Sequence, residues 1–358
     1  MSKFHPLTVA RVHRETRDAI VVTFDVPADL RPQYAYDAGQ HLTLRARVDG
    51  EDLRRSYSIC SAVQDAQLRV AIKRCADGRF SNWANDHLAP GATIDVMPPA
   101  GHFALPPDAQ SARRYLAFAA GSGITPIRSI VETTLRAEPH SSFTLVYGNR
   151  SSAAVIFREE LAELKDRYPG RLNLVHVLSR EHQDIELFNG RITREKCEAL
   201  FAQWITVADH DAAYVCGPES MMREVTAALE AQGMPRTAIK VELFAASIPQ
   251  QAHVPGARPR VGQSECEVTL VIDGSQRHYT MAKDRESVLD AGLAQGIDIR
   301  YSCKGGVCST CRCKVVEGKV EMDANYALED YEIARGFVLS CQSFPVTDRV
   351  VLDFDTDH

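Results

Sequence analysis

Four cysteines in the C-terminal part of the chain have a spacing that suits a metal centre. Cys303, Cys308 and Cys311 follow a C-x4-C-x2-C pattern, and Cys341 lies in LSCQS further along the chain. Structural zinc sites usually combine two C-x2-C pairs that close a tetrahedron. Three close thiols and one distant thiol are instead typical of a [2Fe–2S] cluster. We therefore predict that these four thiolates are cluster ligands.

The residues between these cysteines support a cluster loop. Gly305 and Gly306 allow a tight backbone and can turn N–H groups toward sulfur. Cys313 follows Cys311 by two residues and would share its face of a strand. We expect Cys313 to be a packed free thiol rather than a ligand.

Length and composition exclude several classes of protein. The 358 residues suffice for two or three domains, and the net charge of −6 does not indicate a nucleic-acid partner. No stretch reaches the ~20 apolar residues that a membrane-spanning helix needs. The N-terminal residues lack the long apolar run of a signal peptide, so we expect a cytoplasmic protein, in which stable disulfides are rare.

The segment GSGITP could bind a phosphate. Gly121, Gly123 and Thr125 follow the apolar run YLAFAA and precede a helical pattern. Glycines allow close backbone approach to a pyrophosphate, and a helix N-terminus favours an anion. The motif alone is weak, because many strand–helix turns carry glycine for steric reasons.

Three further motifs accompany GSGITP along the chain. They are RSYS at residues 55–58, GRFSNW at 78–83 and CGP at 216–218. In this order the four motifs resemble those of the ferredoxin–NADP reductase family, over residues 1–245. The resemblance implies that the chain binds FAD and a nicotinamide nucleotide, which carry the redox chemistry while the protein orients them.

The resemblance also implies a role for each residue of the flavin motifs. Arg55 would pair with an FAD phosphate, Tyr57 would stack on the isoalloxazine, and Ser58 would bind flavin N5; Ser56 belongs to the same cofactor-binding motif. Gly78, Phe80 and Ser81 form the second flavin motif, in which Gly78 and Ser81 would hold the FAD pyrophosphate at a helix N-terminus.

The remaining motifs are assigned to the nucleotide and the reacting centre. Gly121, Gly123 and Thr125 would contact the nicotinamide nucleotide, and Cys216 would lie beside the nicotinamide, with Gly217 giving clearance. Glu242 and Phe244 match a short E-x-F motif near the flavin. The residues expected to be catalytic are Ser58, Thr125 and Cys216. Without the resemblance, Tyr57 could be an ordinary strand aromatic and Cys216 a buried small apolar residue.

The strand FTLVYG indicates the choice of nucleotide. It leads into Arg150 and Ser151, and no acidic residue stands at its end to bind a free ribose diol. Arg150 could pair with a 2′-phosphate, and Ser151 could add a hydroxyl donor. We predict a preference for NADPH, with NADH possible; the alternative is that Arg150 is a solvated loop cation.

The elements that must position these residues indicate a multidomain protein. Short alternating segments in residues 1–107 predict an antiparallel β-barrel FAD domain. Five apolar strands alternate with four helical patterns in 108–246, which predicts an α/β doubly wound parallel-sheet nucleotide domain. Residues 247–264 are rich in Pro, Gly and Gln and are expected to be a linker. Residues 265–358 resemble the α+β β-grasp fold of plant-type ferredoxins.

The domain combination predicts an electron-transfer enzyme. A nicotinamide delivers two electrons as a hydride, a [2Fe–2S] cluster accepts one, and a flavin can mediate between them. The whole chain resembles the reductase components of multicomponent oxygenases, in particular those of phenylacetyl-CoA epoxidases in aerobic phenylacetate catabolism. That resemblance implies a di-iron oxygenase component as the electron acceptor. The alternatives are a reductase for a Rieske dioxygenase, a fatty-acyl desaturase or a hybrid-cluster protein, or a redox sensor without turnover.

The charge of the C-terminal domain bears on that acceptor. Residues 265–358 contain 17 acidic and 10 basic side chains. This excess suits a partner with a basic docking patch. A surface that serves only solubility would explain the same charge.

Overall fold

The computed structural model describes residues 4–104, 106–244 and 265–356. It divides into two compact units, one mainly of residues 5–53 and 57–244 and the other built around the C-terminal residues, which are described separately. The predicted linker 247–264 lies outside the described residues. Within the described ranges, no helix is both long and apolar enough to cross a membrane.

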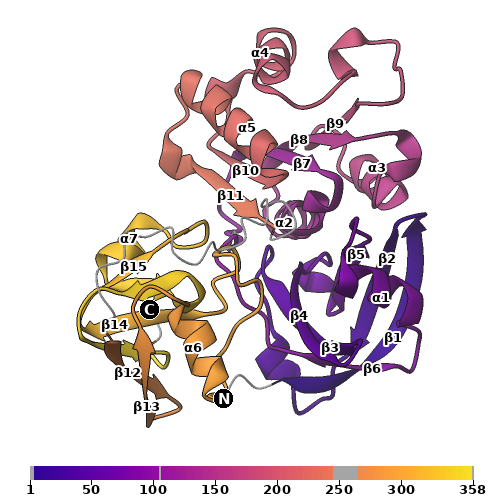
Figure 1. The fold of residues 1–358 in the computed structure, drawn as a ribbon. Helices are drawn as coiled ribbons and strands as arrows, with labels where there is room; N and C mark the ends of the chain where they lie inside the picture. Colours follow the sequence, from indigo (N-terminus) through magenta and orange to yellow (C-terminus); the bar gives the residue numbers. More distant parts are fainter. Residues whose placement is uncertain (1–3, 105, 245–264, 357–358) are drawn as a thin grey trace. The chain divides into compact units, whose positions relative to one another are not determined.

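The N-terminal strands form a closed antiparallel sheet (Figure 1). The strands are β1 (His5–Thr16), β2 (Ala19–Asp25), β3 (His41–Val48), β4 (Glu51–Ser58), β5 (Leu68–Lys73) and β6 (Thr93–Val96), in the order β4-β3-β6-β1-β2-β5. An antiparallel bridge between Ile59 and Val70 joins the two outer strands. Burial alternates at the start of β1, where Leu7 and Val9 face the core. The fold predicted for the first domain is confirmed.

Helix α1 (Arg79–His87) follows β5 and covers part of this sheet. Its buried residues Phe80 and Ala84 are one turn apart and belong to the barrel core. The GRFSNW motif forms the start of this helix, and residues 74–78 separate the helix from the end of β5.

The central residues form a five-stranded parallel sheet. Its strands are β7 (Arg114–Ala120), β8 (Ser142–Asn149), β9 (Leu172–Leu178), β10 (Ala212–Gly217) and β11 (Ile239–Leu243), in the order β11-β10-β7-β8-β9. Figure 1 shows α2 (Ile124–Ala137) and α3 (Arg158–Arg167) on one side of the sheet and α4 (Arg194–Gln203) and α5 (Glu219–Ala231) on the other. The predicted doubly wound fold is confirmed. The order reverses between β7 and β10, and ligands of such sheets bind at that point.

The C-terminal unit contains a mixed sheet with its own core. Its strands run β13 (Ser275–Ala282), β12 (Glu265–Ile272), β18 (Arg349–Asp353), β14 (Arg312–Glu317) and β16 (Phe337–Leu339), with β12 and β18 parallel. Strands β15 (Val320–Met322) and β17 (Ser343–Pro345) form a separate pair, and the helices are α6 (Val288–Ala294) and α7 (Asp330–Ala334). The two-residue turn at Asp273 and Gly274 has positive φ at both positions, which matches the twist of a hairpin. The predicted α+β fold is confirmed.

Candidate functional site

Ser58 and Glu242 meet although 184 residues separate them along the chain. Ser58 ends β4 and is 4% exposed, and its Oγ donates a hydrogen bond of 3.0 Å to Glu242 Oε2. Glu242 lies on β11, next to Cys216 on β10 in the parallel register. The structure therefore brings together three residues that the motifs assigned to the flavin and the nicotinamide.

The pKa values of Glu242 and Cys216 are shifted from their ordinary values. Burial raises the pKa of Glu242 to about 8, against the opposing effect of the Ser58 hydrogen bond. Burial, and then the charge of Glu242, raise the pKa of Cys216 well above its usual range. Both shifts favour the protonated forms of the carboxyl and of the thiol. Phe244, two residues beyond Glu242, packs against the core of the nucleotide-binding sheet.

The rest of the RSYS motif lies on β4. The Tyr57 ring is half-buried, with its centroid 5.8 Å from that of Phe80. Arg55 is exposed, its Nη1 donating to the carbonyl of Arg54 at 2.7 Å, and Ser56 is half-buried. Tyr57 and Arg55 alternate with Ser58 along the strand, so the aromatic ring and the cation share one face.

The start of α1 has the properties of an anion site. Gly78 is the N-cap, and no side chain caps the helix. Ser81 Oγ accepts from the Cys75 N–H and donates to the Gly78 carbonyl, each at 3.2 Å. A Cβ on Gly78 would lie 2.4 Å from that Oγ. Ser81 therefore shapes the turn, and the uncapped N–H groups of the first helical turn suit a phosphate.

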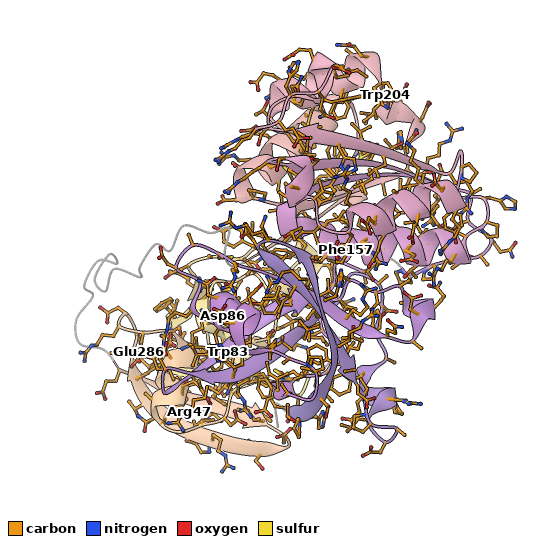
Figure 2. The ribbon with its side chains drawn as sticks, turned by 90° about the vertical axis from the view of Figure 1, so that its right-hand side faces the viewer. Arg47, Trp83, Asp86, Phe157, Trp204 and Glu286 are labelled. Atoms are coloured by element: carbon orange, nitrogen blue, oxygen red, sulfur yellow. The ribbon has the colours of Figure 1, made fainter. Side chains whose placement is uncertain are left out.

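Phe80 has a packing role within this motif. It is 1% exposed, and its ring lies 5.7 Å from that of Trp83, which is labelled in Figure 2. Phe80 thus supports Tyr57 from the barrel core. A side chain so buried leaves the backbone of Phe80, in the first turn of α1, as the part that a cofactor could contact.

The GSGITP and CGP motifs meet at the point where the strand order reverses. Gly121–Gly123 forms the 3₁₀ helix η3 between β7 and α2. Gly121 has φ +55°, and a Cβ on Gly123 would lie 2.2 Å from the carbonyl oxygen of Cys216. Thr125 is 2% exposed and donates from Oγ1 to the Ser122 carbonyl at 2.9 Å. Backbone conformation at Gly121 and close packing at Gly123 therefore both require glycine in this loop. The same loop is the one expected to bind a phosphate.

Gly217 completes the CGP motif with a similar constraint. A Cβ there would lie 2.7 Å from Met221 Cε and 3.2 Å from the Ala120 Cβ. The absence of a side chain thus lets β10 approach the end of β7.

Lys73 is a candidate site residue that the sequence reasoning missed. It ends β5, is half-buried, and its Nζ would lie 3.4 Å from a Cβ on Gly121. Burial, and then the positive charge of Arg150, lower the pKa of Lys73. Within the described residues its ammonium group makes no hydrogen bond or ion pair. Two neighbouring cations beside the glycine loop suit a nucleotide phosphate. The sequence signal was a lysine that ends the strand immediately before GRFSNW.

Arg150 and Ser151 follow β8 as predicted, but an acidic residue lies close to them. Arg150 is exposed, and Ser151 is half-buried. Glu181, from the loop after β9, accepts from the Ser152 N–H at 2.8 Å and from its Oγ at 3.0 Å. These hydrogen bonds lower the pKa of Glu181. The prediction that no carboxylate stands at the end of β8 took account only of the residues that follow β8. The loop after β9, the parallel neighbour of β8, supplies a carboxylate, that of Glu181.

The four predicted cluster cysteines lie close together in the C-terminal unit. Cys308, Cys311 and Cys341 are buried and Cys303 is half-buried. The Cys308 thiol lies beside that of Cys303, and the Cys341 thiol beside that of Cys311; these neighbours lower the pKa of Cys308 and of Cys341. Gly305 donates its N–H to Cys303 Sγ at 3.3 Å. Four converging sulfurs with backbone donors fit an iron–sulfur cluster.

Cys313 differs from these four residues. It is 1% exposed, lies on β14, and its Sγ is 3.9 Å from the carbonyl oxygen of Val338. Burial, the larger effect, and the Cys341 charge raise its pKa. These surroundings suit a packed neutral thiol.

Known protein families match all three regions of the chain. Residues 6–105 match an oxidoreductase FAD-binding domain, residues 118–227 an oxidoreductase NAD-binding domain, and residues 270–346 a 2Fe-2S iron-sulfur cluster binding domain. The cofactors expected from the motifs, FAD, a nicotinamide nucleotide and a [2Fe–2S] cluster, are thus confirmed as classes.

Relatives match the chain over its whole length. The chain is 49% identical to one of the subunits of the 1,2-phenylacetyl-CoA epoxidase of Escherichia coli (strain K12), over 99% of both chains. It is 37% identical to the ferredoxin reductase component of 3-ketosteroid-9-alpha-monooxygenase of Rhodococcus rhodochrous, over 97% of this chain and 96% of that one. The fold is similar to that of phthalate dioxygenase reductase, with a TM-score of 0.58, 23% identity and 98% of both chains covered.

The motifs, the three confirmed folds and these full-length matches agree on one kind of protein. In this chain the FAD-binding barrel and the nucleotide-binding sheet precede a [2Fe–2S] domain, and the relatives match all three over their whole length. The chain belongs to the family of NAD(P)H-dependent flavin and [2Fe–2S] reductases that serve as components of multicomponent oxygenases.

Proposed function

We propose that this reductase delivers electrons to the oxygenase component of a phenylacetyl-CoA epoxidase, a di-iron enzyme by resemblance. The observation that carries this proposal is the 49% identity, over 99% of the chain, to a subunit of the Escherichia coli 1,2-phenylacetyl-CoA epoxidase. A reductase of this class acts in the cytoplasm, where its nucleotide is reduced by metabolism.

The residues of the flavin site have two kinds of role in this proposal, cofactor binding and proton transfer. Arg55 and the start of α1 hold FAD phosphates, and Tyr57 supports the isoalloxazine. Bound FAD accepts a hydride and passes electrons on singly. Ser58 would hydrogen-bond flavin N5, and Glu242, whose Oε2 is 3.0 Å from the Ser58 hydroxyl, would exchange protons with that position through Ser58. The hydrogen that reaches N5 as a hydride must leave N5 as a proton once the electrons have passed on.

The nucleotide is proposed to bind where β7 and β10 diverge. The glycine loop at Gly121 and Gly123 and Thr125 receive the pyrophosphate side, with Lys73 adding charge. Cys216 and Gly217 border the nicotinamide, and Arg150 with Ser151 receives a 2′-phosphate. Four thiolates, those of Cys303, Cys308, Cys311 and Cys341, bind the [2Fe–2S] cluster. From there electrons leave to the acceptor, and the acidic surface of residues 265–358 favours a basic docking face on it.

A second acceptor is favoured by another comparison. The 37% identity to the reductase component of 3-ketosteroid-9-alpha-monooxygenase supports a steroid-oxidising partner. The two possibilities differ in the oxygenase that accepts the electrons, and no residue of the reductase needs to touch the organic substrate in either.

Reconstitution with purified oxygenase components tests the choice. The reductase, NADPH and a phenylacetyl-CoA epoxidase oxygenase should give epoxide formation coupled to NADPH consumption. Substituting a ketosteroid oxygenase component should give slow, uncoupled NADPH oxidation. Efficient turnover with the steroid enzyme alone would reverse the assignment. NADPH-driven reduction of cytochrome c without either partner distinguishes an enzyme from a redox sensor without turnover.

A further inference from the structure

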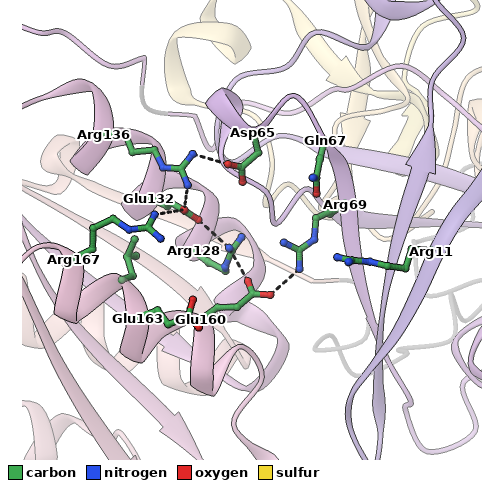
Figure 3. Close-up of a pocket in the computed structure, with 11 residues that line it drawn as sticks. Arg11, Asp65, Gln67, Arg69, Arg128, Glu132, Arg136, Glu160, Glu163 and Arg167 are labelled. Carbon is green, nitrogen blue, oxygen red and sulfur yellow. Dashed lines mark hydrogen bonds and ion pairs between the residues drawn. The ribbon is translucent and has the colours of Figure 1, made fainter.

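A hollow lined by charged side chains lies between the barrel and the nucleotide-binding sheet. Its volume is about 350 Å³, and its walls come from β1 and β5, the loop at residues 60–67, and helices α2 and α3 (Figure 3). Four residues connect across it, Arg69, Arg128, Glu132 and Glu160, and we call them the charged clasp. None of them belongs to the motifs that bind cofactors.

Arg128 is the centre of the charged clasp. Its side chain is 7% exposed, and Nη2 forms ion pairs with Glu132 at 2.9 Å and Glu160 at 2.7 Å. Its Nη1 donates to the carbonyl of Cys60, and the guanidinium lies 5.2 Å from the centroid of the Phe157 ring. One side chain on α2 thus holds the barrel through Cys60 and α3 through Glu160.

Glu160 extends the connection back to the barrel. Its Oε1 lies 2.9 Å from Nη2 of Arg69, which is on β5 and is largely buried. Cys60 in turn donates its own N–H to the Arg69 carbonyl at 2.9 Å. Arg128 and Arg69 are therefore both connected to the barrel backbone at Cys60. Arg128 bonds to the Cys60 carbonyl, the Arg69 carbonyl accepts from the Cys60 N–H, and the two arginines share the Glu160 carboxylate.

The same face of α2 continues this attachment along the helix. Ser129 Oγ donates to the Ser61 carbonyl at 2.7 Å, and Thr133 Oγ1 accepts from the Val63 N–H at 3.1 Å. One turn further, Arg136 pairs with Asp65 at 2.5 Å. Residues 129, 133 and 136 follow the i, i+4, i+7 spacing of one helix face. Helix α2 is thus fixed against residues 60–65 over its length.

Both ends of this attachment lead to the reacting centre. Cys60 stands two residues after Ser58, which is assigned to the flavin. Arg128 stands three residues after Thr125, about one helical turn from the nucleotide loop. A displacement of α2 along the loop at residues 60–65 would therefore change the separation between nicotinamide and flavin. Rates of transfer between bound reactants fall steeply with such misplacement.

The charged character of the contact argues for a role in orientation. Buried ion pairs add little net stability compared with packed apolar residues, because desolvation offsets their attraction. They do require one geometry, since each charge must find its partner. An apolar interface would hold the two domains together but would permit small shifts of the helix.

We propose that Arg128 is a positioning residue for hydride transfer, acting through the backbone of Cys60 and the carboxylate of Glu160. The inference rests on the proposed assignment of Ser58 and Thr125 to the two cofactors. In the step it serves, a hydride leaves C4 of the nicotinamide of NADPH, which becomes NADP⁺. The hydride reaches N5 of FAD, and one proton completes FADH₂.

Anaerobic stopped-flow reduction of the intact holoenzyme tests this role. At saturating NADPH, Arg128→Met should reduce the rate of flavin bleaching by at least about tenfold. The dissociation constant for NADPH should change by less than about threefold, because the variant leaves the nucleotide contacts in place. Arg128→Lys, which keeps the charge and one donor nitrogen, should recover part of the rate. NADPH deuterated at the transferred position should show an undiminished isotope effect, as expected if the hydride step itself is slowed.

Arg167→Met is the matched control. Arg167 is half-exposed, and within the charged clasp it pairs with Glu132 at 3.9 Å. This ion pair joins α3 to α2 and does not involve the barrel. This variant should bleach at the wild-type rate. If Arg128→Met loses FAD or does not fold, Glu160→Gln is tested in its place. Its rate of flavin bleaching should fall by about threefold or more at full FAD content.

Two results would overturn the proposal. One is wild-type bleaching in Arg128→Met, or in Glu160→Gln where that variant decides. The other is an equal loss in Arg167→Met, which would assign the effect to general destabilisation. Failure of the proposed function would look different, because wild-type protein would then still show flavin bleaching with NADPH but would not support epoxide formation by the phenylacetyl-CoA epoxidase oxygenase.

Discussion

At the residue scale, the reacting centre depends on groups that lie far apart in the sequence. Ser58 could be assigned from the RSYS motif, yet its hydrogen bond to Glu242 follows from two domains meeting. The short E-x-F pattern named Glu242 without indicating its protonation. Its raised pKa comes from burial at the end of a parallel strand, which no local pattern encodes.

Glu242 should make the free energy of unfolding depend on pH below about 8 and the rate of flavin reduction depend on pH near 8. The unfolded carboxyl loses its proton near pH 4 to 5, whereas the folded one keeps it to about pH 8. The folded protein binds more protons between these values, so the free energy of unfolding should fall as pH rises through that window and level off above it. The rate of flavin reduction by NADPH should also fall above pH 8, because an ionised Glu242 would oppose the negative charge that the flavin gains with the hydride.

Glu242→Gln checks this expectation with urea unfolding and stopped-flow reduction from pH 6 to 9. The variant should lose the fall in stability that Glu242 causes and the step in rate near pH 8. Ser58→Ala keeps the carboxyl and should keep a pH-dependent stability while slowing reduction. A step near pH 8 that persists in Glu242→Gln would assign the titration to another group.

Arg150 and Glu181 should have opposite effects on nucleotide choice. Arg150→Ala should lower kcat/KM for NADPH by roughly tenfold or more, which corresponds to a charge-assisted contact of about 1.5–3 kcal/mol. It should leave kcat/KM for NADH nearly unchanged. Glu181→Gln should leave NADPH use unchanged or improve it, because a carboxylate near Ser152 repels a 2′-phosphate. Equal loss for both nucleotides in Arg150→Ala, or a wild-type preference for NADH, would contradict the assignment.

At the scale of elements, strand and helix patterns predicted the three folds correctly. Nearly continuous apolar strands alternating with helices could only form a buried parallel sheet, and alternating strands predicted the barrel. Contacts between elements could not be predicted as well from the sequence. Lys73, Arg128 and Glu181 each act across strands or helices that are distant in the chain. Their roles depend on sheet order and on the docking of α2, which local periodicity leaves undetermined.

Gly123 tests the contact between the two nucleotide motifs. In Gly123→Ala the new Cβ would meet the Cys216 carbonyl at 2.2 Å, and backbone there cannot yield cheaply. The variant should lose about 1–3 kcal/mol of stability and bind NADPH more weakly, while keeping FAD. Gly148→Ala is the matched control, because its Cβ would meet the flexible end of Ile192 at 2.9 Å. Thermal unfolding and NADPH titration measure both, and equal effects would show that backbone contact is not the cause.

At the scale of the whole molecule, separate cores predict separable activities. The barrel and the nucleotide-binding sheet contain cores that share no residue with that of the C-terminal unit. A protein truncated near residue 250 should bind FAD and reduce ferricyanide with NADPH at close to the full-length rate. It should lack the cluster and reduce cytochrome c poorly. Loss of FAD from the truncated protein would place the domain boundary elsewhere.

The central claim is that electrons pass from NADPH through FAD to a cluster held by four cysteines. Anaerobic NADPH reduction followed by flavin absorbance and EPR tests it most directly. Wild type and Cys313→Ser should show flavin bleaching and then the signal of a reduced [2Fe–2S] cluster. Cys341→Ser should bleach its flavin and give no such signal, and flavin-free protein should give none with NADPH. A normal cluster signal in Cys341→Ser, or rapid cluster reduction without flavin, would contradict the account.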